Sequence, residues 1–281
     1  MYKLPLVAMA LLPAIVLCIY VFKKDKVEKE PIGLLLKLLL FGALSCFPAA
    51  IIENILIEVI NLAFSQQAAL SPELYQATNY LYQFFTNFVG IALVEEGIKF
   101  LILVLVTRGN KEFNSLFDGL IYSIFVSLGF AALENVLYVL QYGFEVAVMR
   151  AVLSVPGHMF FAVLMGYYYS IWHITEKAIL AEIDLKLQQL IPNDSHAFNT
   201  KSSIVMCLLM PVLAHGFYDF CCSLGTALGT LLTIAFIAFL YAYCFSKIIK
   251  FSKNDKYEND YVRYMIESKY PGVVKKEEAT L

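Results

Sequence analysis

The sequence predicts an all-α protein, a polytopic transmembrane helical bundle of about seven spans with its N-terminus outside and its C-terminus inside. Three observations support this prediction. Hydrophobic residues make up 60% of the 281 residues and charged residues 16%, whereas apolar residues are about 45–50% of a soluble domain. Uncharged apolar runs long enough to cross a bilayer recur along the chain. Lysine and arginine gather in alternate loops between these runs.

The predicted spans follow one another with short connections. They cover residues 4–22, 33–62, 79–106, 115–141, 147–175, 203–222 and 226–246. The first span is followed by four lysines rather than by a small-residue cleavage site, which is typical of an uncleaved anchor. The second span is longer than one upright helix needs, and Pro48 predicts a kink within it.

The loop charges set the predicted orientation. The loops at 23–32, 107–114 and 176–202 and the tail after 246 carry Lys or Arg, whereas the loops at 63–78, 142–146 and 223–225 carry none. The positive-inside rule then requires an odd number of spans. We expect one transmembrane domain at 1–251, with a motif-bearing core at 88–220, and a mobile cytoplasmic tail at 252–281.

These features also limit the surroundings and partners of the protein. The spans predict a multi-pass protein of the cell membrane, with the lipid bilayer around it. The net charge of −2 gives no indication of a nucleic-acid partner.

Ionisable residues inside the apolar spans are the strongest indication of function. Glu95, Glu96 and Lys99 lie in the third span, where an ionised group costs about 2.5–3.5 kcal/mol near the bilayer centre. Lys99 follows the two glutamates by four and three residues, so it can neighbour either of them. We expect it to bind one carboxylate and to leave the other for chemistry. A buried ion pair that only holds the bundle together is the structural alternative.

Three later spans carry further polar residues. Glu134 could orient a water, bind a metal or accept a hydrogen bond from a histidine, whereas an interhelical hydrogen bond is favoured for Asn135. His158 taken alone is more typical of a packed, hydrogen-bonded residue than of a ligand. His215 and Asp219 are spaced i and i+4, so the carboxylate can fix the imidazole or join it at a metal. A local helix-surface pair is the alternative.

Taken together, these carboxylates and histidines on four spans are the groups needed to activate water away from lipid. Other polar residues are assigned ordinary roles. We expect Glu53 and Glu58 to meet water towards the outer end of the second span, and Arg150 to lie near the outer end of the fifth.

At these motifs the chain resembles the PrsW family of intramembrane proteases, which is related in motif layout to the CAAX prenyl endopeptidases and the bacteriocin-processing membrane proteases. The resemblance covers about 88–220. It rests on Glu95-Glu96-Gly97-Ile98-Lys99, Asp118-Gly119-Leu120-Ile121-Tyr122, Gly129-Phe130-Ala131-Ala132-Leu133-Glu134-Asn135, the segment from Arg150 to His158, and His215-Gly216-Phe217-Tyr218-Asp219.

This resemblance implies an endopeptidase that cuts a membrane-anchored protein, with an anti-sigma factor as the kind of substrate. Glu95 and Glu96 match the catalytic glutamate pair, and His215 matches the catalytic histidine. Glu134 matches the glutamate of the Phe-x-x-x-Glu motif that begins at Phe130, and Asp219 matches the aspartate of the His-x-x-x-Asp motif that begins at His215. His158 is a further candidate for a catalytic residue. The prenyl endopeptidases would carry histidine in place of Glu134 and asparagine in place of Asp219, so the chain is closer to PrsW.

The sequence leaves the need for a metal open. The absence of an H-E-x-x-H motif favours chemistry without a required cofactor. His158, His215 and Glu134 could nevertheless supply three ligands to zinc or another divalent metal. In the expected mechanism, Glu95 or Glu96 deprotonates a water, and His215, held by Asp219, stabilises the oxyanion.

Two other classes of function use similar residues. A proton-coupled transporter or channel also carries glutamate, lysine and histidine inside its spans, but such proteins often contain inverted repeats, and we find none in this sequence. A non-catalytic membrane scaffold is disfavoured because every expected motif residue is present.

Overall fold

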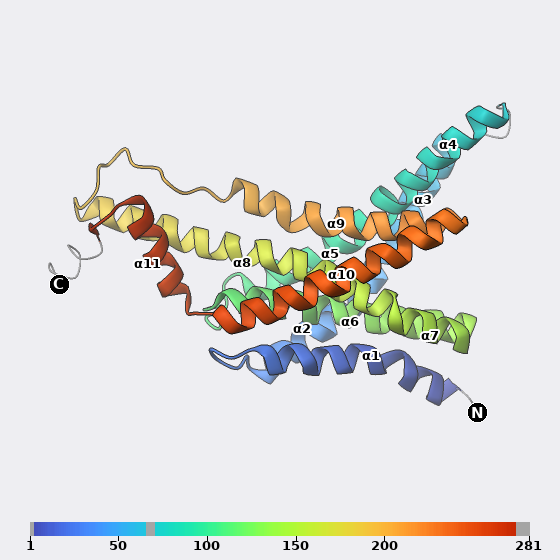
Figure 1. Cartoon of the computed structure of the whole chain (residues 1–281), viewed down its shortest axis with the longest axis horizontal. Helices are drawn as coiled ribbons and strands as arrows, with labels where there is room; N and C mark the ends of the chain where they lie inside the picture. Colours follow the sequence, from blue (N-terminus) through green and yellow to red (C-terminus); the bar gives the residue numbers. More distant parts are fainter. Residues whose placement is uncertain (1–2, 66–70, 274–281) are drawn as a thin grey trace.

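Helices form the secondary structure of this computed structural model, which describes residues 3–65 and 71–273 (Figure 1). Residues 66–70 of the predicted outer loop and residues 274–281 of the predicted tail lie outside the described part. In chain order the helices are α1 (Lys3–Lys24), α2 (Ile32–Leu44), α3 (Cys46–Ala63), α4 (Pro72–Phe84), the π-helix η2 (Phe85–Ala92), α5 (Leu93–Thr107), α6 (Leu116–Tyr142), α7 (Phe144–Val152), α8 (Ser154–Leu187), α9 (Lys201–Ser223), α10 (Ala227–Asn254) and α11 (Glu258–Lys269).

Six helical stretches within the described residues are long and apolar enough to cross a membrane. They correspond to the predicted spans except the third, 79–106, which is divided into the end of α4, η2 and α5. The beginning of α1 and the helix α11 lie at opposite ends of the bundle, as an odd number of crossings predicts (Figure 1). The number of crossings and their orientation stay predictions.

The second span is interrupted where α2 ends and α3 begins. The break lies at Ser45, three residues before Pro48. Proline has no amide hydrogen, so Pro48 cannot donate to the carbonyl of Leu44 one turn earlier, and α2 ends at that residue. The Ser45 hydroxyl donates to the carbonyl oxygen of Gly42 at 2.7 Å.

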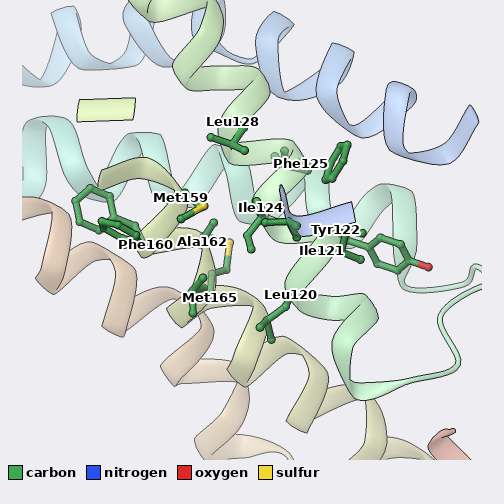
Figure 2. Packing of buried hydrophobic residues seen from close by; sticks show 14 of the residues in the cluster. Leu120, Ile121, Tyr122, Ile124, Phe125, Leu128, Met159, Phe160, Ala162 and Met165 are labelled. Carbon is green, nitrogen blue, oxygen red and sulfur yellow. The ribbon is translucent and has the colours of Figure 1, made fainter. Parts of the chain in front are cut away.

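The helix α6 is the centre of the bundle and is buried without interruption from Phe117 to Ala131. It packs against α1, α2 and α8. Figure 2 shows its side chains Leu120 and Ile124 in the apolar core that α6 shares with α8. At Gly129 a Cβ atom would lie 2.1 Å from the backbone oxygen of Leu39, so only glycine permits α2 to approach so closely.

The helix α11 packs against the end of α8. Leu185, Ile191, Ile266 and Val273 form a small apolar cluster there, and His173 Nε2 lies 2.9 Å from Glu258 Oε2. The structure therefore gives residues 258–269 a packed helix in place of the mobile tail that we expected. The domain boundary after residue 251 stays a prediction, and α10 continues past it to Asn254.

Candidate active site

The two adjacent glutamates lie in the first turn of α5, directly after the π-helix η2. π-helical segments often occur at functional sites. Asn87 of η2 donates a hydrogen bond to Ser223 Oγ of α9 at 2.9 Å, which ties η2 to the helix that carries the second candidate motif. Glu95 is 5% exposed and Glu96 is fully buried.

Lys99 contacts both glutamates of this pair. Its Nζ lies 2.9 Å from Glu95 Oε2 and 2.8 Å from Glu96 Oε1. The prediction that Lys99 binds one carboxylate and leaves the other unbound is therefore wrong. The spacings of four and three residues place the two carboxylates on either side of the same ammonium group.

His158 of α8 is the third partner of Lys99. The ammonium nitrogen lies 3.1 Å from His158 Nδ1 and also sits 4.1 Å from the centre of the Phe130 ring. An ammonium group only donates, so Nδ1 accepts and the ring proton is on Nε2. That Nε2–H donates to Glu134 Oε2 at 2.9 Å. His158 is therefore held as the neutral ring between a cation and a carboxylate.

His215 of α9 lies between two carboxylates. Its Nδ1 is 3.0 Å from Glu96 Oε1, and its Nε2 is 3.1 Å from Asp219 Oδ2. Ionised carboxylates only accept, so both ring nitrogens donate and the ring is cationic. Phe161 stacks on this ring with centroids 4.8 Å apart. The other Glu96 oxygen, Oε2, is buried with no hydrogen-bond partner among the described residues.

Glu134 of α6 has a second partner in Arg150 of α7. Arg150 Nη2 lies 2.8 Å from Glu134 Oε2, its Nε donates to Asn135 Oδ1 at 3.1 Å, and its guanidinium carbon lies 4.0 Å from the centre of the Tyr138 ring. Asn135 in turn donates to the carbonyl oxygen of Ala10 in α1 at 2.8 Å. This is the interhelical hydrogen bond that the sequence favoured for Asn135.

These groups meet at one cavity of about 660 Å³. Its wall includes six of the residues that the sequence predicted for the site, which are Glu95, Phe130, Glu134, His158, His215 and Asp219. Glu96 and Lys99 lie directly behind this wall, bound to its members. The structure thus brings together residues from α5, α6, α8 and α9 that are up to about 120 residues apart in the sequence.

Two cavity residues were not among the predicted site residues. Arg150, which was expected near the outer end of its span, lines the cavity and binds Glu134. Glu53 was expected to meet water, but it lines the cavity with Cys46 and Ala50 of α3. The spacing of these three residues, 46, 50 and 53, places them on one helical face and is the signal that could have indicated the correct position.

The donor atoms at this site also fit a divalent metal. Glu95, Glu96, His158 and His215 can each offer one ligand atom, and these atoms lie within 4.8 Å of one another. Carboxylate oxygen and imidazole nitrogen are ligands that zinc accepts. Glu96 Oε2, which has no hydrogen-bond partner among the described residues, is an oxygen atom that could coordinate the metal. Glu134, which we proposed as a ligand with the two histidines, is bound to His158 Nε2 and lies outside this group.

The fold and the site define a multi-pass helical membrane protein whose buried carboxylates and imidazoles line a cavity. A family model described as PrsW family intramembrane metalloprotease matches residues 30–245. The chain therefore belongs to this family and is a membrane-embedded peptidase.

Similar proteins support this assignment. The chain is 29% identical to a protein called Protease PrsW from Clostridioides difficile, over 90% of this chain and 94% of the relative. It is 30% identical to one from Oceanobacillus iheyensis, over 89% of this chain and 98% of the relative. A third Protease PrsW, from Bacillus subtilis, is 29% identical over 76% of this chain and 81% of its own length. No solved structure matches the chain.

Proposed function

We propose that this chain hydrolyses a peptide bond in a membrane-anchored protein, and that Glu95 activates the attacking water. The observation that carries the proposal is the convergence of Glu95, His158 and His215 on one cavity. Glu95 is the glutamate of the pair that lines the cavity, whereas Glu96 is enclosed between Lys99 and His215. Lys99 contacts only the Oε2 atom of Glu95, so Oε1 is the oxygen left for water.

The proposed reaction is a general-base hydrolysis. Glu95 takes a proton from water, and the hydroxide forms a bond to the scissile carbonyl carbon. The positive charge of His215, whose two N–H groups are bound to Glu96 and Asp219, stabilises the oxygen that becomes negative in the tetrahedral intermediate. The carbon–nitrogen bond then breaks, and the proton taken by Glu95 passes to the leaving amine. Glu96 and Asp219 hold the His215 ring in its cationic form.

The other residues of the site keep these groups in place. Lys99 neutralises the glutamate pair, which would otherwise repel each other in a buried position. His158 orients Lys99 through Nδ1, and Glu134 fixes the His158 ring through Nε2. Arg150 supplies a positive charge to the same Glu134 oxygen that His158 contacts.

A divalent metal, where present, would be held by Glu95, Glu96, His158 and His215, the last after loss of one of its two ring protons, and would act as a Lewis acid on water or on the carbonyl oxygen. Our expectation that no cofactor is required stays a proposal. Its test is the cleavage rate after exhaustive chelation, followed by the addition of zinc.

The proposed substrate is a protein with a membrane anchor, of the anti-sigma-factor kind that the family resemblance implies. The test is cleavage of such a substrate in proteoliposomes by wild type, Glu95→Gln and Glu96→Gln. We expect Glu95→Gln to lower the rate by at least about 10²-fold, as the loss of a general base does. Equal rates for wild type and Glu95→Gln would remove Glu95 as the base. Proton movement across the membrane without any cleavage would favour the transporter instead.

A further inference from the structure

Glu53 is a carboxylate of the cavity wall that the proposed reaction does not use. It lies on the face of α3 that also places Cys46 and Ala50 at the cavity. The neighbouring side chains Ile51, Ile52 and Ile55 are exposed on the rest of the helix surface, as expected for contact with lipid. Glu53 is therefore directed to the cavity by the helical register.

One oxygen of this carboxylate has no partner. Glu53 Oε1 is buried and has no hydrogen-bond partner among residues 3–65 and 71–273. A buried polar atom without a hydrogen bond costs about 1–3 kcal/mol, and a charged one costs more. A carboxylate in this position is therefore stabilised by any ligand that brings a donor to it.

The other carboxylates of the cavity wall each have a cationic partner. Glu95 is paired with Lys99 and Glu134 with Arg150, while Asp219 is paired with the His215 ring. Among the described residues, Glu53 has no such ion pair, and Glu95 and Glu134 are close enough to interact with it electrostatically. Glu53 thus faces the cavity without a protein cation in direct contact among the described residues, so a positively charged ligand there would favour its ionised form.

We propose that Glu53 is a specificity-determining residue that binds a lysine or arginine side chain of the substrate in this cavity. This inference rests on the proposed function. A basic side chain supplies both the missing donor and the missing positive charge, and charge-assisted hydrogen bonds are the strongest of their kind.

The test uses one anchored substrate with lysine or glutamine placed in turn at each of the four positions on either side of its cleavage site. Wild type, Glu53→Gln and Glu53→Lys are compared in proteoliposomes by kcat/KM. Glu58→Gln is the matched control, because Glu58 lies on the same helix, is exposed and does not line the cavity.

We expect wild type and Glu58→Gln to prefer lysine over glutamine by at least about 10-fold at one position, as a charge-assisted hydrogen bond implies. Glu53→Gln should lose this preference and keep its rate on the glutamine substrate, which also reports correct folding. Glu53→Lys should prefer glutamine over lysine at the same position.

Two outcomes would overturn the inference. A wild type that cleaves the lysine and glutamine substrates equally has no basic subsite. A lysine preference that persists in Glu53→Gln assigns the subsite to another residue. Either result leaves the proposed hydrolysis intact, whereas a wild type that cleaves none of the substrates contradicts the proposed function itself.

Discussion

Replacement of Lys99 by methionine tests the electrostatic account of the site. Methionine has a similar length and no charge, so it fills the same space while it removes the ammonium group. Glu95 then loses its counter-charge, Glu96 keeps only the His215 ring, and His158 Nδ1 loses its donor. Because Lys99 is only 1% exposed, water does not replace these contacts. Breaking a buried ion pair by removing one partner costs about 3–5 kcal/mol.

The measurement is the free energy of unfolding in mixed micelles, for wild type, Lys99→Met, Glu96→Gln and the double variant. A loss of about 3–5 kcal/mol lowers the folding equilibrium constant by roughly 10²–10⁴-fold. The double variant should lose less than the sum of the two single changes, because Lys99 and Glu96 contact each other directly and each single change already removes that contact. A Lys99→Met variant within about 1 kcal/mol of wild type, or strict additivity in the cycle, would refute the reasoning.

Three further predictions concern other parts of the protein. Gly216→Ala should destabilise the fold by about 1–3 kcal/mol, because the added Cβ would lie 2.4 Å from the Phe88 ring, and its melting temperature should fall. Arg150→Met should lower cleavage by at least about 10-fold, because Glu134 loses its charged partner, and the proteoliposome assay measures this. Burial and then repulsion from Asp118 raise the pKa of Glu30 from 4.5 to about 9. The contribution of Glu30 to stability is therefore complete below pH 4.5 and is lost as the pH rises through 9. The melting temperature of Glu30→Gln should accordingly rise relative to that of wild type over that pH range.

Gly97→Ala is the control for the packing prediction, and a contradicting outcome can be stated for all three. Gly97→Ala adds a Cβ that meets nothing within 4 Å, so it should leave the melting temperature unchanged or higher. A loss equal to that of Gly216→Ala would contradict the packing argument. Full activity in Arg150→Met would show that Glu134 needs no cationic partner. A constant difference between Glu30→Gln and wild type across the pH range would contradict the raised pKa.

Local spacing in the sequence predicted the contacts that lie within one helix. The pair His215–Asp219 and the contacts of Lys99 with the glutamates follow from separations of three and four residues. The convergence of the polar residues was predicted from the cost of isolated charges in lipid, which requires an interior partner or cavity for each of them.

Contacts between helices could not be predicted in the same way. That Lys99 donates to His158 and that Arg150 reaches Glu134 depends on how α5, α6, α7 and α8 rotate against one another. The rotation is set by packing, such as the close approach of α2 to α6 at Gly129. It cannot be predicted from the hydrophobic runs of the sequence. The position of Glu53 was missed because its span was judged by depth in the membrane rather than by helical face.

The third predicted span shows a second limit of the sequence. Its apolar run is continuous in composition, yet the backbone changes from α to π over Phe85–Ala92 and back again at Leu93. A π-helix arises from tertiary context, here including the contact of Asn87 with Ser223 of α9. Hydropathy alone therefore did not predict the division of this segment into α4, η2 and α5.

The most direct test of the central claim is the cleavage rate of Glu95→Gln in proteoliposomes that contain a membrane-anchored substrate. Glutamine keeps the shape of the side chain and removes its ability to take a proton. Our account predicts a rate at least about 10²-fold below that of wild type, while Glu58→Gln cleaves at the wild-type rate. A Glu95→Gln protein that is folded and cleaves as fast as wild type would contradict the account.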